Sequence, residues 1–194
     1  MNPATATAKV ASAAVAGADQ ISLTLNTSRN VTIQINNNSD TFSLANPRTH
    51  NISGCCYHPP QPTIKTKTQE TCTFSKTSYA ARGSVGVLTY QIHRKKSNPV
   101  GELAIMFSVP YDYSLFENWF ALGIFEANIP CNYDLFKRMY YDGDGYDDLF
   151  TREKGTGGVI TYSGKGVLVK GTMSAFGQSI IKVELWDEDL AALD

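Results

Sequence analysis

Three histidines, His50, His58 and His93, are the side chains of this sequence best suited to acid–base or metal chemistry. They lie in or beside polar stretches, and none belongs to a Gly-x-Ser-x-Gly nucleophile turn or to a His-Glu-x-x-His metal pair. The glycines at 155–158 and 164–166 match neither a phosphate-binding loop nor a dinucleotide fingerprint, so we interpret them as hairpin turns. Because no nucleophile and base stand together, we expect the protein not to be an enzyme and to need no cofactor.

An acidic turn at 142–148 and four cysteines are the remaining candidates for metal binding. The turn resembles a calcium loop, but tyrosine occupies its fifth position and aspartate its sixth, where Asp or Asn and then glycine are needed. The unevenly spaced cysteines form no CxxC pair, which argues against zinc. We expect no metal site and free buried thiols, with a disulfide from Cys72 to Cys55 or Cys56 left open for an oxidising compartment.

Aromatic residues, in contrast, are concentrated in one part of the chain. Thirteen of the 21 lie between residues 107 and 150. The stretch 110–118 also carries Pro, Asp, Ser and Asn, which predicts an exposed loop, and Tyr113, Phe116 and Trp119 fit a core poorly. Aromatic rings suit the membrane interface and attract quaternary ammonium groups, so choline-headed lipids are the expected ligand class. The alternative is that these rings only fill the core.

The composition limits the class of protein that can carry such a loop. The 194 residues suit one domain, and 42% hydrophobic against 18% charged residues argues against disorder. A net charge of -1 gives no field that would attract phosphate backbones, so we expect no nucleic-acid partner. No apolar run approaches the roughly 18–20 residues of a transmembrane helix.

Most of the chain has the alternating pattern of half-buried strands. An alanine-rich stretch at about 4–18 predicts a helix, and the spacing of apolar residues at 132–141 predicts a second one. The expected fold is therefore mainly β, a single β-sandwich flanked by two short α-helices. The predicted strands are 21–25, 31–35, 41–44, 64–68, 85–93, 102–109, 119–125, 158–162, 166–172 and 179–186.

Three stretches identify a known family. The runs 83–90, 103–113 and 118–120 closely resemble the core of the actinoporins, the pore-forming cytolysins of sea anemones. The resemblance extends from about residue 29 to residue 186, and the cysteines and the 137–141 helix look more like the actinoporin-like proteins of fishes. It implies a soluble monomer that binds phosphocholine lipids, sphingomyelin especially, and then forms a homo-oligomer on the membrane.

The resemblance also assigns site residues. Phe136 stands where the toxins carry a tyrosine, which removes a phosphate hydrogen bond of about 1 kcal/mol but keeps a ring face for choline. Two tryptophans of the toxins' docking loop are replaced by Leu115 and Phe120. The expected phosphocholine-binding residues are Ser53, Val85, Ser108, Pro110, Phe136, Tyr140 and Tyr141. The expected membrane-docking residues are Tyr113, Leu115, Phe116, Trp119 and Phe120.

The N-terminal segment departs most from the family. We divide the chain into an N-terminal amphipathic, membrane-inserting segment at 1–28 and an actinoporin-like β-sandwich domain at 29–194. Fifteen helical residues from about 4 to 18 span about 22 Å, less than the roughly 30 Å hydrocarbon core, unless the 21–25 stretch detaches and joins them. The segment lacks the basic start and leucine-rich centre of a signal peptide, and whether the protein is secreted or stored in the cytoplasm stays open.

Two functions follow from this resemblance. The first is a pore-forming cytolysin that binds phosphocholine and sphingomyelin membranes, oligomerises, and inserts its N-terminal helix as a cation-conducting pore at the target cell membrane. The second is a non-lytic module that binds lipid headgroups or glycans, because fungal fruit-body lectins resemble actinoporins in fold.

Overall fold

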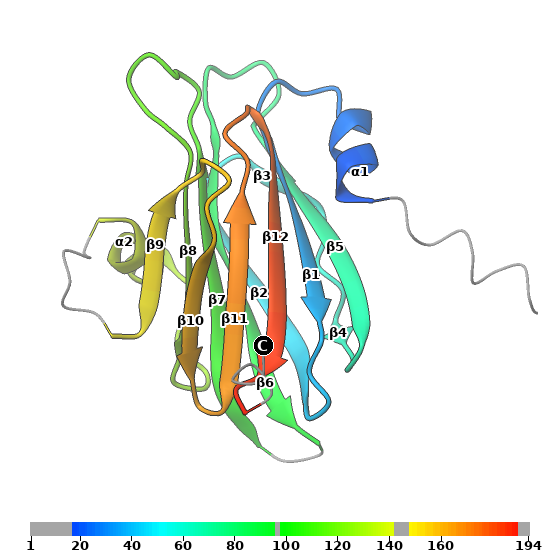
Figure 1. Ribbon diagram of the computed structural model, residues 1–194. Coiled ribbons are helices and arrows are strands. Elements are labelled where there is room, and N and C mark those ends of the chain that lie inside the picture. Colours follow the sequence, from blue (N-terminus) through cyan, green and yellow to red (C-terminus); the bar gives the residue numbers. More distant parts are fainter. Residues whose placement is uncertain (1–16, 96–97, 142–147, 190–194) are drawn as a thin grey trace, which may run out of the picture.

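The computed structural model describes residues 17–95, 98–141 and 148–189, which form two six-stranded sheets packed face to face (Figure 1). The predicted β-sandwich is confirmed. The first sheet has the strand order β10 (Ile160–Gly164), β11 (Val167–Met173), β12 (Gln178–Asp187), β1 (Asn30–Asn37), β5 (Thr68–Ser75) and β3 (Cys55–His58). The second has the order β4 (Thr63–Ile64), β2 (Phe42–Ser53), β6 (Ser84–Arg94), β7 (Pro99–Val109), β8 (Trp119–Phe125) and β9 (Phe150–Lys154).

The core lies between the sheets and follows from strand alternation. In β1 the predicted inward residues Val31, Ile33 and Ile35 are buried, and the strand pairs in parallel with β12 on one side and antiparallel with β5 on the other. Phe74 and Phe107 meet across the two sheets with ring centroids 4.5 Å apart. Full burial of such side chains contributes about 1.5–3 kcal/mol each, so this layer dominates the stability of the fold.

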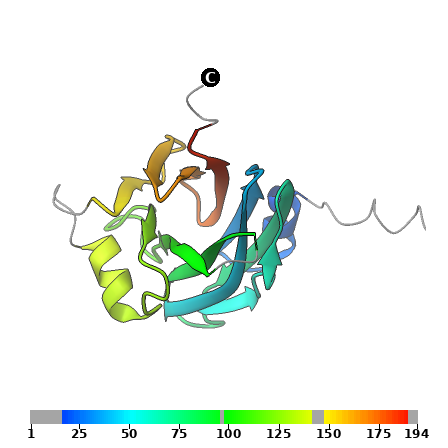
Figure 2. The same cartoon turned by 90° about the horizontal axis from the view of Figure 1, so that it is seen from below.

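The helix α2 (Tyr133–Tyr140) covers the outer face of the second sheet, as Figure 2 shows from below. Asn132 caps its start, because the Asn132 side-chain oxygen accepts a hydrogen bond from the Leu135 amide at 3.1 Å. Leu135, Phe136 and Met139 are buried against the sheet. The prediction of a helix at 132–141 is therefore confirmed.

The helix α1 (Ala18–Thr24) corrects another prediction, since residues 21–25 are largely helical where a strand was expected. Ala18, Ser22 and Leu25 are buried at helical spacing, and α1 contacts β1 and β12 on the outer face of the first sheet. The buried Ser22 hydroxyl donates to the Asn30 side-chain oxygen at 3.1 Å. Of the helix predicted at about 4–18 only the last two residues, and of the segment 1–28 only its part from residue 17, lie among the described residues.

The sequence patterns also missed β3, β5 and β9, which carry many polar residues. The three histidines were expected in or beside polar loops, but they lie within β2, β3 and β6.

All four cysteines are free thiols. Cys72 is buried, and burial raises the pKa of its thiol. Cys55 is exposed, which contradicts the expectation that every thiol is buried. The acidic turn lies outside the described residues except for Asp148. No helix in the described ranges has the length and apolar character needed to cross a bilayer.

Candidate functional site

One end of the sandwich carries most of the exposed aromatic residues. We call it the aromatic end and define it by residues 27–29, 76–83, 110–118 and 174–177, at the top of Figure 1. Backbone hydrogen bonds join these segments: the amide of Asn30 donates to the Gly177 carbonyl at 2.9 Å, and that of Lys76 to the Arg29 carbonyl at 3.0 Å. The exposed aromatic side chains at this end are Tyr79, Tyr111, Tyr113, Phe116 and Phe176.

The opposite end, which we call the polar end, consists of the turns 38–41, 65–67 and 164–166, at the bottom of Figure 1. Here Asp187 accepts hydrogen bonds from the Ser39 hydroxyl at 2.9 Å and from the Asp40 amide at 2.7 Å. Lys67 forms an ion pair with Asp40 at 3.0 Å. These turns bear no large exposed hydrophobic side chain among the residues that the structure describes.

Sheet register brings several predicted site residues into one row near the aromatic end. Ser53 pairs with Val85, Val85 with Ser108, and Ser108 with Trp119, across β2, β6, β7 and β8. Residues paired in this way project to the same face of an antiparallel sheet. Val85 packs with Tyr140 against the cluster beneath α2, so the row belongs to the outer face of the second sheet.

The second half of α2 and its C-cap residue add three aromatic rings. Phe136 and Tyr140 are stacked with their centroids 5.4 Å apart, and Tyr141 meets Tyr140 edge-on at 4.7 Å. Phe136 is only 3% exposed, whereas Tyr141 is 63% exposed. The Phe136 ring, which was expected to offer a face to choline, therefore supports the ring of Tyr140 in this structure.

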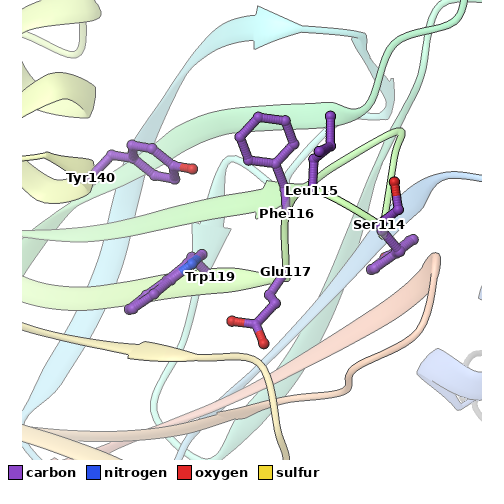
Figure 3. Close-up of a pocket in the computed structure, with 7 residues that line it drawn as sticks. Ser114, Leu115, Phe116, Glu117, Trp119 and Tyr140 are labelled. Atoms are coloured by element: carbon purple, nitrogen blue, oxygen red, sulfur yellow. The ribbon is translucent and has the colours of Figure 1, made fainter.

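A cleft of about 330 Å³ lies between the tip of α2 and the 110–118 loop. Figure 3 shows the rings of Phe116, Trp119 and Tyr140 around one space, with the Tyr140 hydroxyl pointing into it. The cleft joins the two predicted groups, because Tyr140 comes from the headgroup set and the other rings from the docking set. Its lining residues are Tyr113, Ser114, Leu115, Phe116, Glu117, Trp119 and Tyr140.

Charged side chains surround the tryptophan of this cleft. The Arg152 guanidinium lies 5.6 Å from the Trp119 ring centroid and donates a hydrogen bond to the Tyr140 carbonyl. The Lys154 ammonium lies 5.8 Å from the same centroid and forms an ion pair with Glu117 at 2.7 Å. The hydrogen bond with Glu117 raises the pKa of Lys154. The site thus places a carboxylate and two cations beside aromatic faces, an arrangement that can accept a zwitterion.

Hydrogen bonds hold the 110–118 loop in place. Asp112 accepts from the amide and hydroxyl of Ser114 at 2.8 and 2.6 Å, and these bonds lower the pKa of Asp112. The Tyr113 hydroxyl donates to the Asn118 side-chain oxygen at 2.7 Å, and burial raises the Tyr113 pKa. The Arg29 guanidinium donates to the Tyr111 carbonyl at 2.7 Å and lies 4.8 Å from the Tyr113 ring centroid. The loop is therefore ordered before any ligand arrives.

The structure exposes some of the remaining predicted site residues and buries others. Leu115 and Phe116 are 71% and 56% exposed, as a docking loop requires. Phe120 has no exposed surface, because alternation along β8 turns Trp119 outward and Phe120 into the core, so its assignment to the exposed surface is wrong. Ser108, in β7, and Pro110, the first residue of the loop, are buried. Val85, Ser53 and Tyr141 do not line the cleft.

Sequence reasoning missed three residues at or near this end, Glu117, Arg152 and Phe176. Arg152 reaches the Trp119 ring only because β9 pairs with β8, which places it opposite Ala121 and two residues along the same face from Trp119. No local pattern in the sequence shows that pairing. For Phe176 a signal did exist, since a lone aromatic residue directly before Gly177, between the predicted strands 166–172 and 179–186, has no core to enter.

The family model described as sea anemone cytotoxic protein matches residues 8–186. The chain belongs to this family. Relatives include DELTA-actitoxin-Ucs1a of Urticina crassicornis, 32% identical over 106 residues, or 54% of this chain and 42% of that protein. Bryoporin of Physcomitrium patens is 30% identical over 132 residues, or 62% and 65% of the two chains. The match therefore spans about two fifths to two thirds of the length of these curated relatives.

Among solved structures, the lipid binding protein Nakanori is similar to this member of the cytotoxic protein family. The TM-score is 0.60, with 13% identity over 87% of this chain and 75% of that one. At this identity the likeness concerns the fold alone. It agrees with the two-sheet architecture and leaves the chemistry of the cleft to be argued from the residues themselves.

Proposed function

We propose that this protein is a pore-forming cytolysin that binds membranes of phosphocholine lipids, sphingomyelin among them, oligomerises there and inserts its N-terminal segment as a cation-conducting pore. Membership of the sea anemone cytotoxic protein family supports a cytolytic or lipid-binding role. The observation that carries the proposal is the cleft in which Phe116, Trp119 and Tyr140 face one another beside Glu117.

The headgroup chemistry fits this cleft. A quaternary ammonium cannot donate hydrogen bonds, so aromatic faces bind it well, at about 0.5–2 kcal/mol per well-placed contact. Glu117 supplies a carboxylate on the same side, ion-paired with Lys154, while the Tyr140 hydroxyl and Arg152, beside the Trp119 ring, are groups that can donate to a phosphate. A neutral zwitterion satisfies both halves of the site, which agrees with a chain of net charge -1.

The attachment of α1 supports release of the N-terminal segment. The helix rests on the outer face of the first sheet through Ala18, Ser22 and Leu25, while β1 is hydrogen-bonded along its whole length on both sides. Movement of α1 therefore leaves the core between the sheets intact. The natural pivot lies before Thr27, because the Thr27 carbonyl accepts from the side chains of Asn30 and Gln178, which hold the rest of the linker to the fixed strands.

The test measures binding and leakage on the same vesicles. We expect the full chain to sediment with vesicles of equimolar phosphatidylcholine and sphingomyelin and to release a trapped dye. A variant lacking residues 1–18 should bind but not release dye. Binding without leakage by the full chain would contradict the pore and favour a non-lytic lipid-binding module, a role consistent with the name of Nakanori. Binding only to immobilised glycans would favour the lectin-like alternative.

A double substitution tests the cleft itself. We expect Tyr140→Ala with Tyr141→Ala to weaken vesicle binding by at least about a hundredfold, since two aromatic contacts are lost together. Tyr57→Ala is the matched control, because Tyr57 is 56% exposed on the edge strand β3 and should bind unchanged. Unchanged binding of the double variant would refute this placement of the headgroup.

A further inference from the structure

The turn between β11 and β12 presents a phenylalanine to solvent at the aromatic end. Phe176 is 74% exposed, more than Phe116 or Leu115 in the 110–118 loop. Its neighbours Ser174, Ala175 and Gly177 carry no charge. An aromatic side chain left in water at a turn tip contributes nothing to the core, and its exposure calls for an apolar partner.

Asn118 fixes the turn to the docking loop. Its side-chain nitrogen donates to the Ser174 carbonyl at 2.9 Å and to the Phe176 carbonyl at 3.0 Å, and its oxygen accepts from Tyr113. Asn118 is 2% exposed, so these bonds are shielded from water. One buried side chain thus sets the position of Phe176 relative to the cleft.

The turn also packs tightly on the linker that follows α1. The Gly177 carbonyl accepts from the Asn30 amide at 2.9 Å, and a Cβ on Gly177 would lie 2.6 Å from the Ser28 carbonyl oxygen. A side chain at that position would force the turn away from the linker. Phe176 is therefore presented on a rigid support, with little conformational entropy left to lose on binding.

We propose that Phe176 is a second membrane anchor, which enters the lipid interface beside the 110–118 loop when the protein meets a phosphocholine bilayer. The proposal rests on the proposed function and names a contact outside the headgroup cleft. A bilayer is the occupant that fits, because Phe176, Leu115 and Tyr79 protrude from separate loops of one end. A fluid interface accepts separate protruding side chains, and an uncharged turn loses little hydration on entering it.

The experiment measures partition into vesicles of equimolar phosphatidylcholine and sphingomyelin for the full chain and its variants. We expect Phe176→Ala to partition about tenfold less and Phe176→Glu less still, because one ring is no longer buried and a charge is then brought to the interface. Phe176→Trp should partition within about twofold of the unaltered chain, since tryptophan also favours the interface. Thr66→Glu, an exposed position at the polar end, is the matched charge control and should bind unchanged.

A second measurement follows the anchor directly. The fluorescence of the tryptophan added by Phe176→Trp should be quenched by vesicles of brominated phosphatidylcholine, beyond the quenching of the unaltered chain. Thermal unfolding confirms that each variant is folded. Unchanged partition of Phe176→Ala and Phe176→Glu, with binding lost in the Tyr140→Ala and Tyr141→Ala variant, would overturn this anchor alone. Failure of the unaltered chain to bind would overturn the proposed function and the anchor with it.

Discussion

Side-chain hydrogen bonds hold the loops at both ends of the sandwich, but the two ends present different surfaces to solvent. At the polar end Asp187 and Ser39 bind neighbouring backbone groups, and charged side chains meet the solvent. At the aromatic end Asn118 and Arg29 bind backbone carbonyls just as closely, yet Leu115, Phe116 and Phe176 remain exposed. The exposed rings are therefore not a result of loose packing. Loops that are held by hydrogen bonds and still expose apolar side chains indicate a surface suited to contact with an apolar partner.

The largest expected effect is on the buried residue that organises the aromatic end. Asn118→Ala should lower the free energy of unfolding by about 2–4 kcal/mol, because two carbonyls and the Tyr113 hydroxyl lose their partner. Urea denaturation measures this change. Ser39→Ala at the polar end should also destabilise the fold, since the Ser39 hydroxyl accepts from the Thr41 and Phe42 amides. Only Asn118→Ala should weaken vesicle binding, and equal binding losses in both would erase the contrast between the ends.

The two tryptophans offer a sharper comparison, since Trp119 lies in the cleft and Trp186 at the polar end of β12. Trp119→Ala should weaken partition into phosphocholine vesicles about thirtyfold, the equivalent of about 2 kcal/mol of lost ring contact. Trp186→Ala should change partition less than about twofold, because its ring is not at the binding surface. Sedimentation with vesicles measures both. Equal losses would mean that the whole molecule, and not one end, meets the membrane.

The smallest of the three expected effects is the loss of thermal stability when acid protonates Asp187 at the polar end. Burial raises the pKa of Asp187, but hydrogen bonds from the Asp40 amide and Ser39 outweigh it, so the net pKa lies below the ordinary 3.8. The folded state therefore favours the carboxylate, and its stabilisation is present above about pH 4 and lost as the pH falls through the lowered pKa. We expect the melting temperature to fall on this acidification, and to fall less in Asp187→Asn. An equally steep fall in that variant would assign the acid sensitivity to other groups.

Alternation in the sequence predicted the central strands, because their buried residues are large and apolar. It misjudged 21–25, where Ile21, Leu23 and Leu25 alternate but the buried face of the helix is Ala18, Ser22 and Leu25. Ser22 is polar and falls between the alternating apolar residues, yet it is buried and its hydroxyl donates to the Asn30 side-chain oxygen. A tertiary hydrogen bond of this kind leaves no trace in a local hydrophobic pattern.

The site was predictable only in part for a similar reason. The family resemblance assigned Phe116, Trp119 and Tyr140 to the site, because they lie within or between recognisable stretches. It could not separate Trp119 from Phe120, which differ only in the face of β8 to which they point. Arg152 reaches Trp119 through strand pairing, and Phe176 is held at the 110–118 loop by turn packing, which are long-range properties of the chain. Glu117 lies in that loop, but its ion pair with Lys154 depends on the same strand pairing.

The parallel pairing of β1 with β12 has a consequence for the order in which the protein is made. The strand that begins the sandwich is completed by the last one, about 150 residues later by the register Asn30 with Gln178. Until β12 docks, the Gly177 carbonyl cannot accept from Asn30, and Asn118 has no turn to hold. A growing chain therefore carries the aromatic residues long before it carries the assembled aromatic end. The surface proposed to meet lipid is complete only when synthesis of the sandwich is complete.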